Sequence, residues 1–363
     1  MKYVMAVGLC MVALGAWQVT TFNPEEEREE TSSAELFGPD ALTVMTRGLS
    51  TGAGLERLLE APGTAESFAA LSRADVSTHV RRLADEIQYA RPHLIGLQQV
   101  KQVRLQSPGD AIFGGTQPAE SLYLDLLPVL LSELQARGLH YREVARVRNA
   151  DLEVPLLTSA APTFDDVRVT DFDVILARAD VDVSGARMGH YRARREEDRP
   201  RGWASVAATV EGRKYRFVST HLEPAPDETG LRVQLAQAEE LIGSLRRESL
   251  PVVLVGDFNT PANLGLVGAP TYRELLLAGY VDVWTHRKEK VAWSSAALDV
   301  PRREERLNLV LVRNPVTPLP RQLGPVLAYG VGSALEEPRF GPWPSDLTGV
   351  VARLRMPLAT VRN

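Results

Sequence analysis

Apolar residues along the chain fall into two patterns, short continuous runs and positions at helical spacing. The short runs predict buried strands at residues 41–46, 94–98, 251–259, 307–313 and 349–356. Helical spacing predicts helices over 74–91, which Pro92 ends, over the leucines from Leu122 to Leu134, and over 231–246 and 271–279. Strands therefore alternate with helices in both halves of the chain.

The middle of the chain follows a different pattern, with short strands separated by turn residues. Strands are predicted at 142–147, 171–178, 203–210 and 214–223, with Glu211 and Gly212 as a hairpin turn. Residues 101–118, 185–200 and 314–345 are expected to be loops. Strand–helix–strand units mixed with hairpins predict an α+β fold, in which two mixed sheets pack together with helices outside, as one domain over residues 41–357.

The N-terminus has the pattern of a targeting segment. Lys2 precedes an apolar run from Tyr3 to about Trp17, which contains a small-residue site at Ala13-Leu14-Gly15. Residues 1–22 are predicted to be a signal peptide or an uncleaved membrane anchor, and both place the rest of the chain outside the cytoplasm, secreted, periplasmic or membrane-anchored. Residues 23–40 are expected to form an acidic linker.

Composition and charge narrow the function classes. The 363 residues are 44% hydrophobic and 24% charged, which is ordinary for a globular protein. The net charge of −5, without a basic stripe, does not support a nucleic-acid partner. The single cysteine, Cys10, lies inside the N-terminal segment, so the rest of the chain has no thiol chemistry.

Polar residues stand at the ends of several predicted strands. They occur in LIGLQQV at 94–100, in STHLEP with His221, in VGDFNTP with Asp257 and Asn259, and in PSDL with Asp346. Each alone has a simpler explanation, such as a capped turn or a structural histidine. Together they form the set that phosphoester hydrolysis needs, because carboxylates orient water, an amide fixes it and an imidazole stabilises charge.

These motifs, with VMTRGLSTGA and ERLNLVLVR, occur in an order that resembles the endonuclease/exonuclease/phosphatase superfamily, from about Leu42 to about Arg355. The resemblance implies a DNase I-like fold, a four-layer α/β/β/α sandwich. It also implies a phosphodiesterase or phosphatase that depends on Mg²⁺ or Mn²⁺.

Transferred residue by residue, the resemblance gives a mixed active site. His221, Asp257, Asn259 and Asp346 match residues expected in the family. Four positions depart: Gly48 replaces an asparagine, Gln99 the metal-binding glutamate, Asn308 an aspartate, and Leu347 the histidine of the terminal motif. Any metal would then have only the weakened ligand Gln99, together with Asp346. The neighbouring Gln98, by contrast, is expected to make local hydrogen bonds.

These departures favour a protein with a degenerate active site, a pseudoenzyme that binds a phosphorylated or otherwise anionic small molecule, a lipid headgroup or a protein partner, without a metal. The alternative is a working phosphoesterase that uses Mg²⁺ or Mn²⁺. In that case a group such as Arg187 or His190 would replace Leu347. A purely structural or membrane-tethered role has only the N-terminal segment in its favour.

Overall fold

Two β-sheets form the centre of the computed structural model, which describes residues 41–49, 73–157, 164–195, 199–286, 306–315, 326–329 and 349–355. The first sheet consists of β1 (Leu42–Gly48), β2 (Leu94–Gln106), β3 (Ser121–Asp125), β4 (Tyr141–Leu157), β5 (Phe164–Arg178), β12 (Val326–Tyr329) and β13 (Gly349–Leu354). Its strand order is β12-β13-β1-β2-β5-β4, and β3 pairs with the far half of β2.

The second sheet consists of β6 (Asp182–His190), β7 (Gly202–Val210), β8 (Arg213–His221), β9 (Val252–Asp257), β10 (Val281–Asp282) and β11 (Asn308–Arg313). Its order is β10-β11-β9-β8-β7-β6. The pairs β1–β2 and β8–β9 are parallel and the other pairs are antiparallel. Both sheets are therefore mixed, as the sequence predicted.

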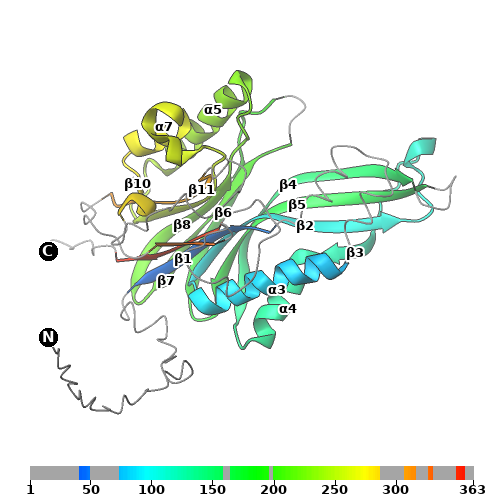
Figure 1. Cartoon of the computed structure of the whole chain (residues 1–363), viewed down its shortest axis with the longest axis horizontal. Helices are drawn as coiled ribbons and strands as arrows, with labels where there is room; N and C mark the ends of the chain where they lie inside the picture. The colour runs from blue at the N-terminus through cyan, green and yellow to red at the C-terminus, as the bar shows by residue number, and fades with distance from the viewer. Residues whose placement is uncertain are drawn as a thin grey trace, which may run out of the picture.

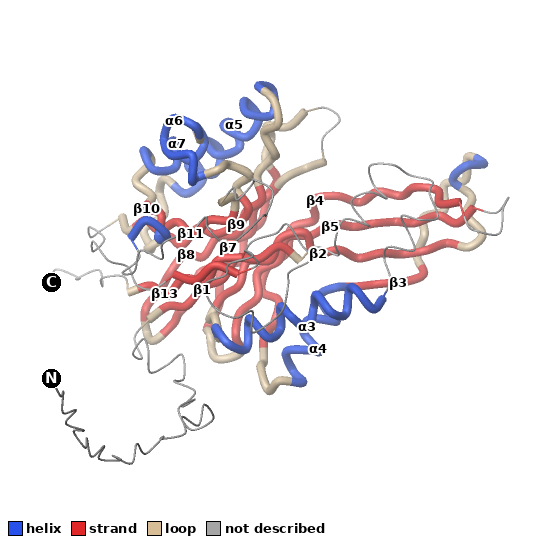
Figure 2. Tube along the Cα trace, in the orientation of Figure 1, coloured by secondary structure: helices blue, strands red, loops and turns tan. Residues whose placement is uncertain are grey.

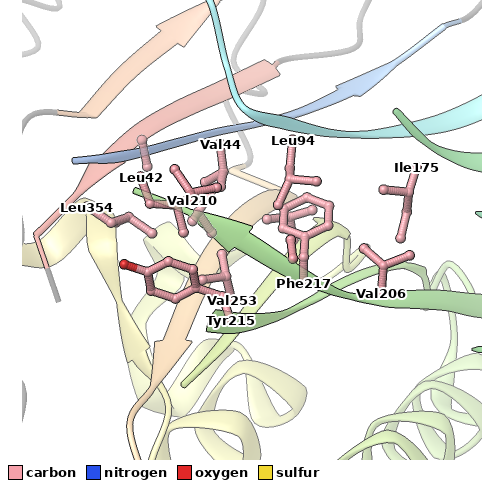
Figure 3. Packing of buried hydrophobic residues seen from close by; sticks show 14 of the residues in the cluster. Leu42, Val44, Leu94, Ile175, Val206, Val210, Tyr215, Phe217, Val253 and Leu354 are labelled. Atoms are coloured by element: carbon pink, nitrogen blue, oxygen red, sulfur yellow. The ribbon is translucent and has the colours of Figure 1, made fainter. Parts of the chain in front are cut away.

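Helices cover the outer face of each sheet (Figures 1 and 2). Helices α3 (Arg73–Ala90) and α4 (Leu126–Ala136) lie on the first sheet, and α5 (Glu228–Leu245), α6 (Gly265–Gly268) and α7 (Pro270–Leu277) lie on the side of the second. One apolar cluster fills the space between the sheets, and Figure 3 shows Phe217 and Val253 of one sheet facing Leu94 of the other. A second apolar cluster joins the first sheet to α3 and α4, and a third joins the second sheet to α5 and α7. This confirms the predicted α/β/β/α sandwich.

The two sheets approach each other closely at Gly96. A Cβ atom there would lie 2.6 Å from Ser219 Oγ and 2.7 Å from a methyl carbon of Val255 on the opposite sheet. Two residues later, the buried side chain of Gln98 spans the same gap. Its Oε1 accepts a hydrogen bond from Thr46 Oγ1 at 3.0 Å, and its Nε2 donates to Ser219 Oγ at 3.0 Å. The local hydrogen bonding expected of Gln98 is therefore confirmed.

Strands β2, β4 and β5 extend together to one end of the molecule, well beyond the rest of the sandwich (Figure 1). The prediction of a loop over 101–118 was wrong in part, because β2 continues to Gln106 between β5 and β3. The predictions at 185–200 and 314–345 were also wrong in part, since they include most of β6 and all of β12. The second half of β2 and strand β6 are rich in polar residues and lack the apolar run on which the sequence prediction depended, whereas β12 is a four-residue apolar strand that the prediction missed.

The leucine helix begins later than predicted. Leu122 lies in β3 and its side chain is 62% exposed, whereas the helix starts at Leu126. Asp125 ends the strand and caps the helix, because its carboxylate accepts a hydrogen bond from the backbone N–H of Leu127 at 3.2 Å. The predicted hairpin turn is confirmed, with Glu211 and Gly212 both at positive φ (50° and 72°) between β7 and β8.

The predicted signal peptide or anchor at 1–22 and the linker at 23–40 lie outside the described residues. None of the helices in the described part of the chain combines the length and the hydropathy that a membrane span requires.

The buried histidine His93 makes stability depend on pH. Its Nδ1 accepts a hydrogen bond from the backbone N–H of Thr43 at 3.0 Å, and burial, with Arg178 nearby, lowers its pKa from 6.5 to about 4. The unfolded chain therefore takes up a proton near pH 6.5, which the folded protein does not do until about pH 4. As the pH falls through this window, we expect protonation of His93 in the unfolded chain to lower the free energy of unfolding by up to about 3 kcal/mol. Urea unfolding of the wild type and His93→Gln, which cannot titrate, measures this loss, and equal slopes with pH in the two proteins would contradict it.

The bridge made by Gln98 is expected to stabilise the contact between the sheets. Gln98→Leu fills the same space but leaves Thr46 and Ser219 without this partner, so the free energy of unfolding should fall by about 2–4 kcal/mol. The neighbouring Gln99→Leu is the control and should cost less than about 1 kcal/mol, since Gln99 is only half-buried. Equal losses for both variants in urea unfolding would show that the bridge is not specific.

Candidate functional site

His221 ends strand β8 and lies between two carboxylates from different sheets. Its Nδ1 is 3.8 Å from Asp173 Oδ1 on β5, and its Nε2 is 4.0 Å from Asp257 Oδ2 at the end of β9. All three residues are buried. The structure thus brings the predicted pair His221 and Asp257 together, and adds Asp173, which the sequence analysis did not select.

The segment after β9 holds Asp257 and Asn259 in a tight turn. Gly256 has φ of 148°, and a Cβ there would lie 1.9 Å from the carbonyl oxygen of Thr220, so this position requires glycine. The N–H of Asn259 donates to Asp257 Oδ1 at 2.9 Å, and its side-chain Nδ2 donates to the carbonyl of Leu222 at 2.8 Å. The turn therefore fixes both predicted residues beside His221.

Gln98 and Gln99 form a β-bulge. Leu97 pairs with Val174 and Val100 with Phe172, so the two glutamines together oppose the single residue Asp173. Gln99 has φ of 59°, and its backbone N–H donates to Asp173 Oδ1 at 3.2 Å. The structure therefore places the backbone of Gln99 beside Asp173, at the predicted site.

Two further predicted positions lie at the same strand ends. Gly48 ends β1 as the neighbour of Gln98, and Asn308 begins β11 as the strand partner of Asp257. Asn308 is 2% exposed, and within the described ranges its Oδ1 has no hydrogen-bond partner. Asp346 and Leu347 lie outside the described residues, so their place in the site stays a prediction.

The structure also brings in a buried lysine. Lys101 is 2% exposed on β2, and its strand partner on β5 is Asp171, which is 8% exposed. Burial raises the pKa of Asp171 to about 6, and the charge of Lys101 opposes that rise. Sequence reasoning missed this pair because it placed Lys101 in a loop. The spacing of Asp171 and Asp173, which puts both on one face of a strand, was the available signal.

Arg201 supplies a second cation on the other side of His221. Its Nη1 lies 3.1 Å from Nδ1 and 2.9 Å from Nε2 of the imidazole, so it can donate to whichever ring nitrogen is unprotonated. Its Nε pairs with Glu223 Oε2 at 3.1 Å. Asn149 completes the cluster, since its Nδ2 donates to Asp173 Oδ2 at 2.7 Å.

His190 lies at the edge of this region and Arg187 is exposed on the same strand, β6. The ring nitrogen Nε2 of His190 is 2.7 Å from the carbonyl oxygen of Arg148. Among the interactions of the described residues, none joins either side chain to His221 or Asp257.

Solved structures share this fold at low sequence identity. A protein of the endonuclease/exonuclease/phosphatase family from Leptotrichia buccalis matches with a TM-score of 0.53 and 16% identity, over 88% of this chain and 100% of its own. A second, from Beutenbergia cavernae, matches with 0.56 and 18%, over 88% and 73%. A mannosyl-6-phosphatase of Bacteroides thetaiotaomicron matches with 0.52 and 14%, over 86% and 100%. At these identities the likeness concerns the fold alone.

No curated protein matches the chain. The sequence profile of the endonuclease/exonuclease/phosphatase family, in contrast, matches residues 66–346, well over half of the 363 residues. This match shows that the chain belongs to the endonuclease/exonuclease/phosphatase family.

Proposed function

We propose that this family member does not hydrolyse phosphoesters and instead binds a phosphorylated or otherwise anionic ligand at the strand-end site. The observation that carries the proposal is the replacement of charge in the site. Gln99, whose backbone N–H donates to Asp173, has a neutral side chain where the family resemblance implies a glutamate. Two protein cations, Lys101 and Arg201, lie beside the carboxylates of Asp171 and Glu223.

The described part of the site lacks the glutamate that the family resemblance implies as a ligand of the divalent cation, because Gln99 stands at that position. Mg²⁺ prefers one or two carboxylates and keeps several of its waters. Gln99 offers only an uncharged oxygen, and Asp173 already accepts the N–H of Gln99 and the amide of Asn149. No group of three His, Cys, Asp or Glu side chains suitable for a metal occurs in the part of the chain that the structure describes. We therefore assign no step to a metal.

The residue that would orient the charge-stabilising histidine is also altered. Asn308 occupies the position at which the family resemblance implies an aspartate that orients a histidine, and an amide cannot accept charge-assisted hydrogen bonds as a carboxylate does. Each such catalytic group is typically worth about 10²–10⁴ in rate. With several of these groups replaced, the retained His221 and Asp257 should support little phosphoester hydrolysis.

The remaining groups support recognition of an anion. The Arg201 side chain is 16% exposed, and its Nε and Nη1 have partners in Glu223 and His221. Its Nη2 makes no hydrogen bond to the described residues, which leaves this N–H group for a ligand oxygen. A guanidinium beside an imidazole is well suited to phosphate or carboxylate oxygens.

The first prediction of this proposal is the absence of hydrolysis. Wild-type protein with Mg²⁺ or Mn²⁺ should hydrolyse bis(4-nitrophenyl) phosphate and 4-nitrophenyl phosphate no faster than Asp257→Asn. A restored variant that combines Gln99→Glu, Leu347→His, Asn308→Asp and Gly48→Asn with Lys101→Met, which removes the buried cation beside Asp171, should be at least about 100-fold faster. Gln106→Glu, farther along the same strand, replaces Gln99→Glu in the matched control, which should stay inactive. Hydrolysis by the wild type that Asp257→Asn abolishes would instead favour the working Mg²⁺-dependent phosphoesterase.

The second prediction concerns the ligand. Calorimetric titration with inorganic phosphate should show binding that weakens about 10-fold or more in Arg201→Gln, because one charge-assisted hydrogen bond is removed. Arg192→Gln is the control, since Arg192 is 92% exposed and pairs with Glu240. Equal affinity in the wild type and Arg201→Gln would exclude Arg201 as the anion contact.

A further inference from the structure

Four carboxylates gather at the strand-end site. Asp171 and Asp173 come from β5, Asp257 from β9, and Glu223 follows β8. Asp173 has no exposed surface, and the side chains of Asp257 and Glu223 are only 10% and 13% exposed. Charges that lose water in this way need compensation by opposite charge or by hydrogen bonds. The question is which groups supply it.

The β-bulge at Gln98 and Gln99 directs Lys101 into this cluster. The extra residue in β2 reverses the alternation of side chains beyond it. Val100 therefore packs with the helices of the outer face, and Lys101 pairs in register with Asp171 on the inner face. Without the bulge, the lysine would point toward the helices.

Lys101 and Arg201 approach the cluster from different sheets. The fields of Lys101, His221 and Arg201 all act on the carboxyl group of Asp171 and lower its pKa against the effect of burial. Arg201 forms an ion pair with Glu223 at 3.1 Å and also contacts His221. Asp173 and Asp257 accept N–H groups and flank His221.

We propose that Lys101 and Arg201 are resident cations that supply the two positive charges a divalent ion would bring, so that the site holds its anionic ligand without a metal. One lysine and one arginine carry two charges together, which equals the charge of one Mg²⁺ ion. Gln99 fits the same scheme, because a glutamate there would add a fifth carboxylate to a site that already has more carboxylates than protein cations. The inference rests on the proposed function and gives its cofactor requirement.

The test measures metal binding directly, on the full chain. Titration of Mn²⁺, followed by the electron paramagnetic resonance signal of the free ion, should show no saturable binding to the wild type up to about 1 mM. Gln99→Glu alone should behave in the same way because Lys101 is still present. The double variant Gln99→Glu/Lys101→Met should bind Mn²⁺ at least about 10-fold more tightly than the wild type. MgCl₂ should also raise its Tm, while leaving that of the wild type unchanged.

A matched control distinguishes metal binding at the site from an effect of the protein's net charge. Gln106→Glu/Lys101→Met has the same net charge as the double variant and should gain no Mn²⁺ binding. Equal Mn²⁺ binding by the two double variants would overturn the proposal, as would saturable binding to the wild type below about 1 mM. The wild-type titration keeps the proposal falsifiable if the variants do not fold.

The two proposals fail in different ways. A wild-type protein that hydrolyses phosphoesters in EDTA would refute the proposed function and leave the resident cations standing. A wild-type protein that binds Mn²⁺ without hydrolysing anything would refute the resident cations only. Binding of inorganic phosphate that is unchanged by EDTA supports the inference, and binding that requires MgCl₂ contradicts it.

Discussion

The close contact between the two sheets at Gly96 is the constraint on which the site depends. Only a residue without a side chain lets β2 approach Ser219 and Val255 on the opposite sheet so closely. The same approach lets Gln98 span the gap with both ends hydrogen-bonded. It also brings the end of β8 near β5, so that His221 lies between carboxylates of different sheets. A wider spacing would separate these groups.

The β-bulge at Gln98 and Gln99 is the second geometric feature on which the site depends. Because one additional residue lies opposite Asp173, Gln99 adopts a left-handed backbone conformation. Its backbone N–H then donates a hydrogen bond to the Asp173 carboxylate. The bulge also changes which side chains of β2 face inward. Beyond it, the inner face carries Lys101 and then Val103, whose cluster continues along the extended strands. The bulge therefore affects both the site and the part of the first sheet in which β2, β4 and β5 extend beyond the sandwich.

Electrostatics in the proposed metal-free site would differ from those of a metal centre in one physical respect. A bound divalent ion concentrates its charge at one point and adapts its ligands around itself. Lysine and arginine instead spread two charges over two places fixed by the fold, one on each sheet. Such an arrangement leaves fewer open coordination positions for a reacting oxygen. This is consistent with a site that recognises an anion and does not activate it.

Much of the fold could be predicted because its elements have clear apolar periods. Helix α3 and strands β1, β8, β9 and β11 lie where the spacing of apolar residues indicated. The predicted start of α4 was wrong, because Leu122 fits the helical spacing of the leucines but its backbone pairs with β2. The extension of β2 was missed because its alternating polar residues look like a loop until a partner strand is known.

The sequence by itself determined the family, the order of the layers and the positions of His221, Asp257, Asn259, Gln99 and Asn308 at strand ends. These follow from local motifs and from the rule that neighbouring parallel strands end at one edge. Only the tertiary structure decided that Asp173, Asp171, Lys101 and Arg201 join them. Their placement depends on strand register, on one bulge and on the contact between the sheets, which are long-range pairings that no local pattern encodes.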